Sequence, residues 1–592
     1  MVITLPLDIT AIARTLEVLV KIPLYAVLGE TQGRITFIST REGITNLWSM
    51  NYEGKDIRRL TMEPIASVTP VKPELPYIIF TKDVTRGREL HRVFYVDVKG
   101  GDEKLIAETE PMRIFSMSYD RKKVVFTGAT MRGLGLYQVS FTGNWEKLLD
   151  LKVATFVTDV NDNYVVGFGN LRGDPRTFEL FIYSYKTNEV KIYTPRVGSI
   201  SKSPILLKNG KVLFESDFEG ENKLYLYDVE TNKVRELRFS GKDYYDFSPT
   251  EHCIYGELPD GKIWVIAKKN GREKLFIDGY EVPTPEGVIH GLPAFGDSYV
   301  FIAASNLVTP PRILRIDLKT RETTTLIDNR VPDDIAKTFG DRFFVKYKSF
   351  DGLEIPMYVI TSNKAPKPGP TIVFVHGGPW SEVADAWRAM IISLVATGYH
   401  VLAPNFRGST GYGEKFRTLD IGDPGGGDLE DVVYATKWGI ENGITDKDRI
   451  AIMGYSYGGY MTYLALGKYP NIWRCGVAGA GIVDWEEMYE LSDAIFKKFM
   501  EILFAGRKEL FKDRSPIKYV ERVKAPLCII HPQNDTRTPL IPVIKYMTKL
   551  LALGRTFEAH IIPDMGHIIS KVEEAVKILL PAIVFLKKYL ES

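Results

Sequence analysis

Ser456 lies in Gly454-Tyr455-Ser456-Tyr457-Gly458, a G-x-S-x-G pattern that sets one hydroxyl between two glycines. An apolar run ends at Gly454 and a helical pattern begins after Ser456, so the spacing predicts a sharp strand-to-helix turn. Only small neighbours fit such a turn, and the N-terminus of the following helix favours developing negative charge. The pattern therefore predicts a nucleophile elbow; the alternative is a plain strand–helix turn without chemistry.

A serine nucleophile needs a base and an acid, and both are expected in loops that follow later strands. His567 lies in the loop after the last strand-like run, at 557–563, whereas His560 lies inside that run and is expected to be structural. Asp535 follows the apolar run 527–531 and is the best candidate for the acid. Asp484, after the preceding strand, is the runner-up, and Asp564 is more typical of turn chemistry.

The resulting chain order is Ser456, Asp535, His567, which is the order of α/β hydrolases. Two N–H groups should stabilise the oxyanion of the reaction. The first expected donor is the backbone of Tyr457, directly after the nucleophile. The second is Gly378, in the sequence His-Gly-Gly-Pro at 376–379 that follows an apolar strand. A Gly-Gly turn without function is the alternative for that loop.

The first half of the chain is a repeat of short strands. Alternating apolar and polar runs end in turns near residues 54, 100, 143, 188, 232, 271 and 321. A period in the low forties with several strands in each unit is typical of β-propeller blades. Seven such turns predict a seven-bladed propeller.

The second half changes to strands that alternate with helices. A break near 325–340 is followed by a hairpin signal at Asp351-Gly352 and then by continuous apolar runs, from 371 to 563, separated by helical patterns. This alternation predicts a mostly parallel sheet with helices on both faces. The predicted fold is an α/β hydrolase domain plus an all-β seven-bladed propeller, divided as 1–23 (N-terminal helix), 24–330 (propeller) and 331–592 (catalytic domain).

Composition narrows the possible partners. The chain has 76 basic and 74 acidic residues, so nucleic acid is not an expected partner. Three widely spaced cysteines, Cys253, Cys475 and Cys528, form neither a disulfide framework nor a metal cluster, and no metal or other cofactor is expected. We therefore predict a cytoplasmic protein without a membrane span or signal peptide. Scarcity of Gln and Cys, with many charged residues, favours a thermophile source; genome bias is the alternative.

Five motifs together resemble the prolyl oligopeptidase family of serine peptidases, and within it the archaeal acylaminoacyl peptidases, also called acylpeptide hydrolases. They are His-Gly-Gly-Pro at 376–379, Asn-Phe-Arg-Gly-Ser-Thr-Gly-Tyr-Gly at 405–413, the elbow at 454–460, Asp-Thr-Arg-Thr-Pro at 535–539 and Gly-His at 566–567. The resemblance covers about 340–592; the first half matches in architecture and length only.

The resemblance implies that Ser456, Asp535 and His567 form the catalytic triad and that Tyr457 and Gly378 bind the oxyanion. It implies that Arg537 holds a substrate carbonyl, with a surface salt bridge as the alternative. It also implies that the helix at about 9–22 packs on the hydrolase domain, that the propeller admits only short peptides, and that the chain forms a homodimer or larger assembly.

The missing feature that bears on substrate choice within the family is a Glu-Glu pair in the propeller half. The family's dipeptidyl peptidases bind the free N-terminus with a Glu-Glu pair from the propeller domain, and no Glu-Glu occurs before residue 486. Short N-acylated peptides are therefore the expected substrates. Four aromatic residues after the strand at 475–480 are candidates for an apolar pocket, with core packing as an equal alternative: Trp485, Phe496, Phe499 and Phe504.

The sequence thus predicts a serine peptidase that releases N-acylated amino acids from short peptides, with esterase side activity. A carboxylesterase or oligopeptidase of the same family is the first alternative. A catalytically inactive protein whose propeller docks partners is a remote one.

Overall fold

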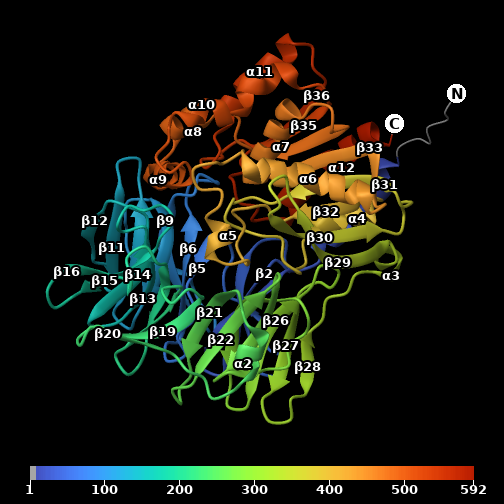
Figure 1. Cartoon of the computed structure of the whole chain (residues 1–592). Helices are drawn as coiled ribbons and strands as arrows, with labels where there is room; N and C mark the ends of the chain where they lie inside the picture. The colour runs from blue at the N-terminus through green and yellow to red at the C-terminus, as the bar shows by residue number, and fades with distance from the viewer. Residues whose placement is uncertain (1–7, 592) are drawn as a thin grey trace.

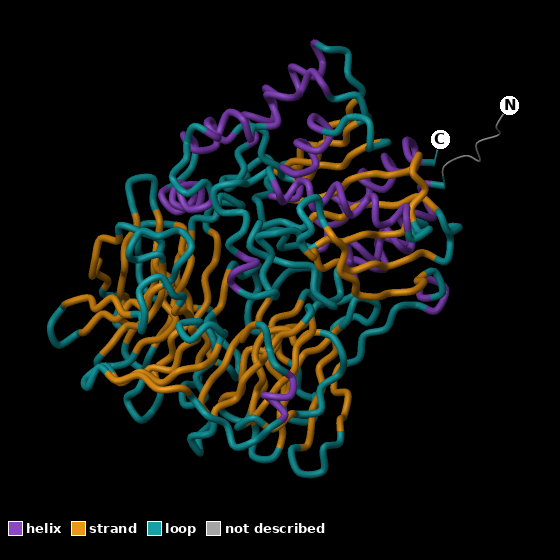
Figure 2. The backbone as a smooth tube through the Cα atoms, in the orientation of Figure 1, coloured by secondary structure: helices purple, strands orange, loops and turns teal. Residues whose placement is uncertain are grey.

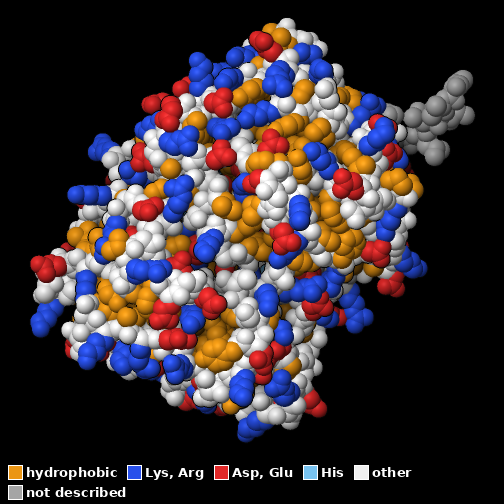
Figure 3. Space-filling model, in the orientation of Figure 1, with side chains coloured by type: hydrophobic (Ala, Val, Ile, Leu, Met, Phe, Trp, Pro, Cys, Tyr) orange, Lys and Arg blue, Asp and Glu red, His pale blue; other side chains and the backbone are white. Residues whose placement is uncertain are grey.

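A computed structural model describes residues 8–591. Its strand-rich lower part and its mixed upper part differ clearly in Figures 1 and 2. The lower part is the propeller and the upper part is an α/β domain. Charged groups of both signs are interspersed over the face seen in Figure 3, in keeping with the balanced charge of the chain.

Five separate four-stranded sheets make up most of the propeller within residues 8–591. Their strands follow the chain from β5 to β24: β5 (Ser67–Val68), β6 (Tyr77–Asp83), β7 (His91–Asp97), β8 (Lys104–Leu105); β9 (Arg113–Tyr119), β10 (Lys123–Ala129), β11 (Leu134–Ser140), β12 (Trp145–Leu151); β13 (Thr155–Val160), β14 (Tyr164–Gly169), β15 (Glu179–Ser184), β16 (Glu189–Tyr193); β17 (Ser201–Leu206), β18 (Val212–Ser216), β19 (Lys223–Asp228), β20 (Lys233–Glu236); β21 (Glu251–Glu257), β22 (Ile263–Lys269), β23 (Arg272–Ile277), β24 (Tyr280–Glu281). The short helix α2 (Asp243–Phe247) precedes β21.

The other strands of the propeller form one continuous eight-stranded sheet, in the order β28-β27-β26-β25-β1-β2-β3-β4. Its strands come from both ends of the repeat: β1 (Tyr25–Thr31), β2 (Arg34–Ser39), β3 (Asn46–Met50), β4 (Arg58–Arg59), β25 (Val288–Phe295), β26 (Tyr299–Ser305), β27 (Arg312–Asp317) and β28 (Thr323–Ile327). A parallel bridge between Val27 and Gly291 joins the two halves. The predicted count of seven blades is therefore corrected: five sheets stand alone and the remainder is one sheet. Counting turns could not reveal this, because the joining contact links residues far apart in the sequence.

The α/β domain contains a second eight-stranded sheet, in the order β29-β30-β32-β31-β33-β34-β35-β36. The strands are β29 (Phe339–Lys348), β30 (Glu354–Ser362), β31 (Gly369–Val375), β32 (His400–Pro404), β33 (Thr445–Tyr455), β34 (Cys475–Gly479), β35 (Leu527–Pro532) and β36 (Phe557–Ile562). β29, β30 and β32 pair antiparallel, and the pairs from β32 to β36 are parallel. This is the predicted hairpin followed by a parallel sheet.

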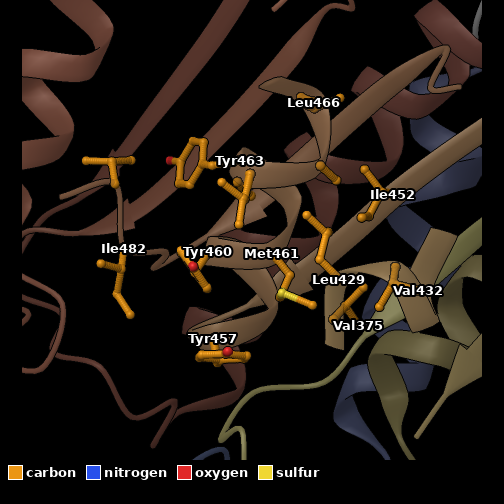
Figure 4. Packing of buried hydrophobic residues seen from close by; sticks show 14 of the residues in the cluster. Val375, Leu429, Val432, Ile452, Tyr457, Tyr460, Met461, Tyr463, Leu466 and Ile482 are labelled. Atoms are coloured by element: carbon orange, nitrogen blue, oxygen red, sulfur yellow. The ribbon is translucent and has the colours of Figure 1, made fainter. Parts of the chain in front are cut away.

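Helices cover both faces of this sheet because its central strands are apolar on both sides. In β33, Ile450 and Ile452 point into one core and Ala451 and Met453 into the other. The first core contains α6 (Gly427–Glu441), α7 (Tyr457–Lys468) and α11 (Leu540–Ala552); the second contains α1 (Ile9–Lys21), α4 (Ala389–Ala396) and α12 (Val572–Leu590). Figure 4 shows side chains of the first core, with the tyrosines of α7 among them. The shorter helices are α3 (Asp333–Ala336), α5 (Glu414–Arg417), α8 (Trp485–Leu491), α9 (Ala494–Leu503), α10 (Leu510–Arg514) and a 3₁₀ helix (Pro516–Arg522).

Helix α1 precedes the propeller in the chain but packs in the α/β domain. Leu16 and Val20 are buried in the same core as α4 and α12. The chain thus passes between the two domains twice, once after α1 and once before α3. The two crossings are side by side, because the Asn329 amide donates to the carbonyl of Pro23 at 2.7 Å.

Candidate active site

The turn at Ser456 has the geometry of a nucleophile elbow. β33 ends at Tyr455, Ser456 adopts φ 61° and ψ −122°, and α7 begins at Tyr457. A Cβ atom at Gly454 would lie 2.6 Å from the carbonyl oxygen of Val375, and one at Gly458 would lie 2.0 Å from it. Only glycine fits at both positions, which is the physical reason for the G-x-S-x-G pattern.

Three loops bring Ser456, His567 and Asp535 into one hydrogen-bonded chain. His567 Nε2 lies 2.9 Å from Ser456 Oγ, and His567 Nδ1 lies 2.7 Å from Asp535 Oδ2. The three residues follow β33, β36 and β35, at the edge where the carboxyl ends of the parallel strands meet. These are the three residues predicted from the sequence, and their catalytic roles stay predictions.

Asp535 is buried and well supplied with hydrogen bonds. Its Oδ1 accepts from the backbone N–H groups of Arg537 and Thr538, each at 2.9 Å, and the Thr538 hydroxyl lies 2.8 Å from Oδ2. Burial alone would raise the pKa of Asp535, but the charge of His567 and these hydrogen bonds outweigh it and lower the pKa to about 2. The carboxylate is therefore ionised and can orient the imidazole.

The alternative acids, Asp484 and Asp564, and the alternative histidine, His560, have other structural roles. Asp484 caps α8, where its side chain accepts from the N–H groups of Glu486 and Glu487. Asp564 sits in a turn with φ 56°. His560 is within β36, paired with Ile530 of β35.

The His-Gly-Gly-Pro loop follows β31 and passes beside Ser456. A Cβ atom at Gly377 would lie 3.3 Å from the Cβ of Ser456, and Gly378 adopts φ 124°. His376 is buried beneath the loop, with Nε2 2.9 Å from Ser409 Oγ and its ring stacked 4.3 Å from Phe406. Burial lowers the pKa of His376 to about 3, so it is a neutral support for the loop. The backbone donors Tyr457 and Gly378 stay predictions.

Arg537 contacts the propeller. Its Nε lies 2.9 Å from both carboxylate oxygens of Glu89, which precedes β7 and is itself paired with Arg113 of β9. Arg113 also reaches Asp493 at 2.6 Å and the Thr536 hydroxyl at 2.7 Å. Sequence reasoning missed Glu89 and Arg113, because no local pattern marks a contact between residues more than 400 positions apart.

The propeller loop 84–90 also touches the loops that carry the two partners of Ser456. The Asn534 amide donates to the carbonyl of Arg86 at 2.8 Å. Gly566, next to His567, packs so closely on Gly87 that a Cβ atom there would lie 1.9 Å from the Gly87 carbonyl oxygen. The two domains therefore meet directly at the candidate active site.

Two of the four aromatic candidates for an apolar pocket take the alternative of core packing. Trp485 and Phe504 are 0% exposed and pack against each other in the core, so they cannot line an open pocket. Phe496 and Phe499 are half-buried, and Phe499 lies edge-on to Trp380, with ring centroids 5.5 Å apart. Trp380 follows the His-Gly-Gly-Pro motif directly, a position that sequence reasoning could have flagged.

Two further residues, Tyr455 and Thr538, hold His567 in the hydrogen-bonded arrangement with Ser456 and Asp535. The Tyr455 hydroxyl donates to the backbone carbonyl of His567 at 2.9 Å, and the Thr538 hydroxyl lies 3.3 Å from His567 Nδ1. Tyr455 lies within the elbow motif itself, but no pattern indicates where its phenol points.

Comparisons with known proteins agree with this architecture. The pattern of the acylamino-acid-releasing enzyme-like N-terminal domain matches residues 36–314, and that of the prolyl oligopeptidase family matches residues 386–592. Dipeptidyl aminopeptidase BIII of Pseudoxanthomonas mexicana is 25% identical over 556 residues, which are 89% of this chain and 74% of that protein. The acylamino-acid-releasing enzyme of Rattus norvegicus is 29% identical over 232 residues, 38% of this chain but only 32% of that protein.

Solved structures share the fold. A puromycin-hydrolyzing peptidase of Mycobacterium tuberculosis superposes with a TM-score of 0.80 at 16% identity, covering 97% of this chain and 96% of that one. The acylaminoacyl peptidase of Pyrococcus horikoshii gives a TM-score of 0.71 at 19% identity, covering 98% and 97%. In the part of the chain that the structure describes, no helix is long and apolar enough to cross a membrane.

Proposed function

This chain belongs to the prolyl oligopeptidase family of serine peptidases, and on that premise we propose that it releases N-acylated amino acids from the N-terminus of short acylated peptides. The observation that carries the chemistry is the unbroken chain of hydrogen bonds from Ser456 through His567 to Asp535, beside the His-Gly-Gly-Pro loop. The propeller, packed against this site, restricts which substrates enter.

The proposed reaction has two halves. His567 Nε2 takes the proton of Ser456 Oγ as that oxygen attacks the substrate carbonyl carbon, and the N–H groups of Tyr457 and Gly378 stabilise the oxyanion. The imidazolium then protonates the leaving amine as the C–N bond breaks, which leaves an ester on Ser456. Water, deprotonated by His567, attacks that ester and releases the N-acylamino acid while Oγ regains its proton. Asp535 holds the imidazole in the required tautomer throughout.

Preference for an acylated terminus is supported by two observations. The propeller sequence lacks the Glu-Glu pair that binds a free N-terminus in dipeptidyl peptidases of the family. Relatives named acylamino-acid-releasing enzymes match part of the chain, 38% of it in the rat protein, and one named acylaminoacyl peptidase shares its fold. Half-buried Phe496, Phe499 and Trp380 offer apolar surface for the side chain next to the scissile bond.

The chemistry is tested by Ser456→Ala. We expect kcat on an acetyl-amino acid ester and on acetyl-peptides to fall by about 10⁶, with the thermal unfolding curve unchanged. Labelling by a fluorophosphonate should be lost in the same variant. Full activity of Ser456→Ala would show that another residue is the nucleophile.

The substrate class is tested by a panel of peptides of increasing length, each with an acetylated or a free N-terminus, in which cleavage at the terminus and at internal bonds is measured. A fatty acyl ester is the reference for carboxylesterase activity. We expect kcat/KM to be highest on short acetylated peptides and to fall with length. Equal rates on the free peptides would support an oligopeptidase or the dipeptidyl activity named for one relative, and a preference for the fatty acyl ester would support a carboxylesterase.

A further inference from the structure

Two side chains end on buried carboxylates: that of Tyr457, one proposed oxyanion donor, and that of Trp380, close to the other donor in the chain. The phenol of Tyr457, 1% exposed, donates to Asp428 Oδ2 at 2.6 Å. Two residues after Gly378, the indole N–H of Trp380 donates to Asp420 Oδ1 at 3.1 Å. Neither carboxylate takes part in the proposed proton transfers, so their burial needs another explanation.

Both carboxylates belong to one short segment, residues 420–428, which leads into α6 and includes its first two residues. Asp420 and Asp428 are each 0% exposed. Asp428 lies in the first turn of α6 and also accepts from the backbone N–H groups of Gly425 at 3.2 Å and Leu429 at 2.8 Å. Its position is therefore set by the backbone around it as well as by Tyr457.

Burying the carboxyl groups of Asp420 and Asp428 is energetically unfavourable. Asp420 Oδ2 is enclosed and has no hydrogen-bond partner among the described residues, and Gly408 lies against it so closely that a Cβ atom there would be 2.5 Å from the carboxyl carbon. Burial, and then the charge of Asp428, raise the pKa of Asp420 well above its usual range; burial raises the pKa of Asp428 to about 6. An apolar side chain of similar size would avoid this cost, so packing alone does not account for the pair.

We propose that Asp428 and Asp420 are positioning residues of the oxyanion hole: Asp428 fixes Tyr457, Asp420 fixes the loop 376–381 through Trp380, and segment 420–428 thereby sets the separation of the two N–H donors. This inference rests on the proposed function. The donor at Tyr457 is the first residue of α7, so a small rotation of that helix about its axis displaces the N–H. A phenol anchored on a separate element opposes that rotation.

The chain supplies matched controls for both anchors. Tyr460 is one turn further along α7, is 0% exposed, and donates its hydroxyl to the carbonyl of Arg514 at 2.9 Å. Trp387 is 5% exposed, and its indole nitrogen has no hydrogen-bond partner among residues 8–591. Loss of the hydroxyl of Tyr460, or replacement of Trp387 by Phe, therefore changes a buried side chain in a similar way without removing a hydrogen bond to Asp428 or Asp420.

The test measures kcat and KM on an acetyl-peptide for Tyr457→Phe and Trp380→Phe, with Tyr460→Phe and Trp387→Phe as controls. We expect Tyr457→Phe to lower kcat by about tenfold with KM within twofold, because misplaced donors act on the transition state and not on the bound substrate. Affinity for a trifluoromethyl ketone, which forms an oxyanion on the serine, should fall by the same factor. The controls should keep kcat within twofold.

Asp428→Ala and Asp428→Asn separate positioning from folding. Asparagine retains an oxygen that accepts from the Tyr457 phenol, so Asp428→Asn should recover most of the kcat that Asp428→Ala loses. If Tyr457→Phe and Tyr460→Phe have equal kcat, or if kcat falls without a parallel loss of ketone affinity, the inference is overturned. A wild-type protein without acyl-peptidase activity, or an active Ser456→Ala, would instead refute the proposed function.

Discussion

Asp535 is a buried carboxylate whose charge is preserved by its neighbours. Its side chain is 0% exposed, and it still has its pKa lowered to about 2 because the charge of His567 and several hydrogen bonds outweigh burial. An ionised acid at this position keeps the imidazole in one tautomer, which is what the proposed proton transfers require.

This lowered pKa predicts an acid dependence of stability. The ordinary pKa of an aspartate in an unfolded chain is about 3.9, above the folded value, so the stabilisation is complete above about pH 4 and is lost as the pH falls toward 2. The contribution is on the order of 2 kcal/mol. We expect the difference in unfolding free energy between wild type and Asp535→Asn to shrink over that range. Ser456→Ala, which keeps the Asp535–His567 pair, should follow wild type; an unchanged difference would contradict the assignment.

Ser456, Asp535 and His567 could be found in the sequence because each follows a strand whose apolar run is legible. The hydroxyls of Tyr455 and Thr538 could not, because their contacts depend on side-chain direction. For Trp485 and Phe504 the sequence left a pocket and core packing equally open, and both residues fill the core.

At the scale of elements, the loop 84–90 of the propeller meets the loops that carry Asp535 and His567. Its Glu89 is 5% exposed and lies between two arginines, Arg113 of the propeller and Arg537 of the α/β domain. Glu89 contacts the Nε of Arg537. That Arg537 also binds a substrate carbonyl stays a prediction.

Glu89→Gln should destabilise the contact between the domains. The substitution leaves two guanidinium groups near one remaining carboxylate, Asp493, and breaking a buried pair in this way costs about 3–5 kcal/mol. We expect a clear fall in the midpoint of thermal unfolding of the full chain. Glu63→Gln is the matched control, because Glu63 is an exposed partner of Lys82 at 3.1 Å. Equal midpoints for the two variants would show that the Glu89 cluster does not hold the domains together.

Most elements of the α/β domain could be predicted, since strands buried on both faces are continuous apolar runs and α7 begins directly after the elbow. The propeller strands were equally legible. Their assembly into sheets was not, since the bridge between Val27 and Gly291 joins the start of the repeat to its end.

At the scale of the whole molecule, the oligomeric state is still a prediction. β36 is an edge strand of the α/β sheet, and apolar side chains are exposed on it and on α11: Ile561 (39%), Ile541 (53%), Ile544 (47%) and Leu551 (71%). An edge strand with exposed apolar neighbours favours association with a second copy. The cytoplasmic location and the thermophile source also stay predictions.

We expect light scattering after size exclusion to give at least twice the mass of one chain. The double substitution Leu551→Lys and Ile561→Lys should reduce it to one chain, because buried lysines would disrupt the contact. Val197→Lys, at a propeller residue that is 73% exposed, is the control and should leave the assembly intact. A wild-type protein with the mass of a single chain would contradict self-association.

The side-by-side crossings near Pro23 and Asn329 have a mechanical consequence. Two covalent connections at distant points would lock one domain against the other, but two that are tied together behave as one joint. The backbone therefore tethers the propeller at one joint and does not by itself set the angle between the domains. The position of the propeller relative to the serine then depends on side-chain contacts between the domains, among them Glu89 with Arg537, Lys202 with Glu414 and Lys268 with Glu382.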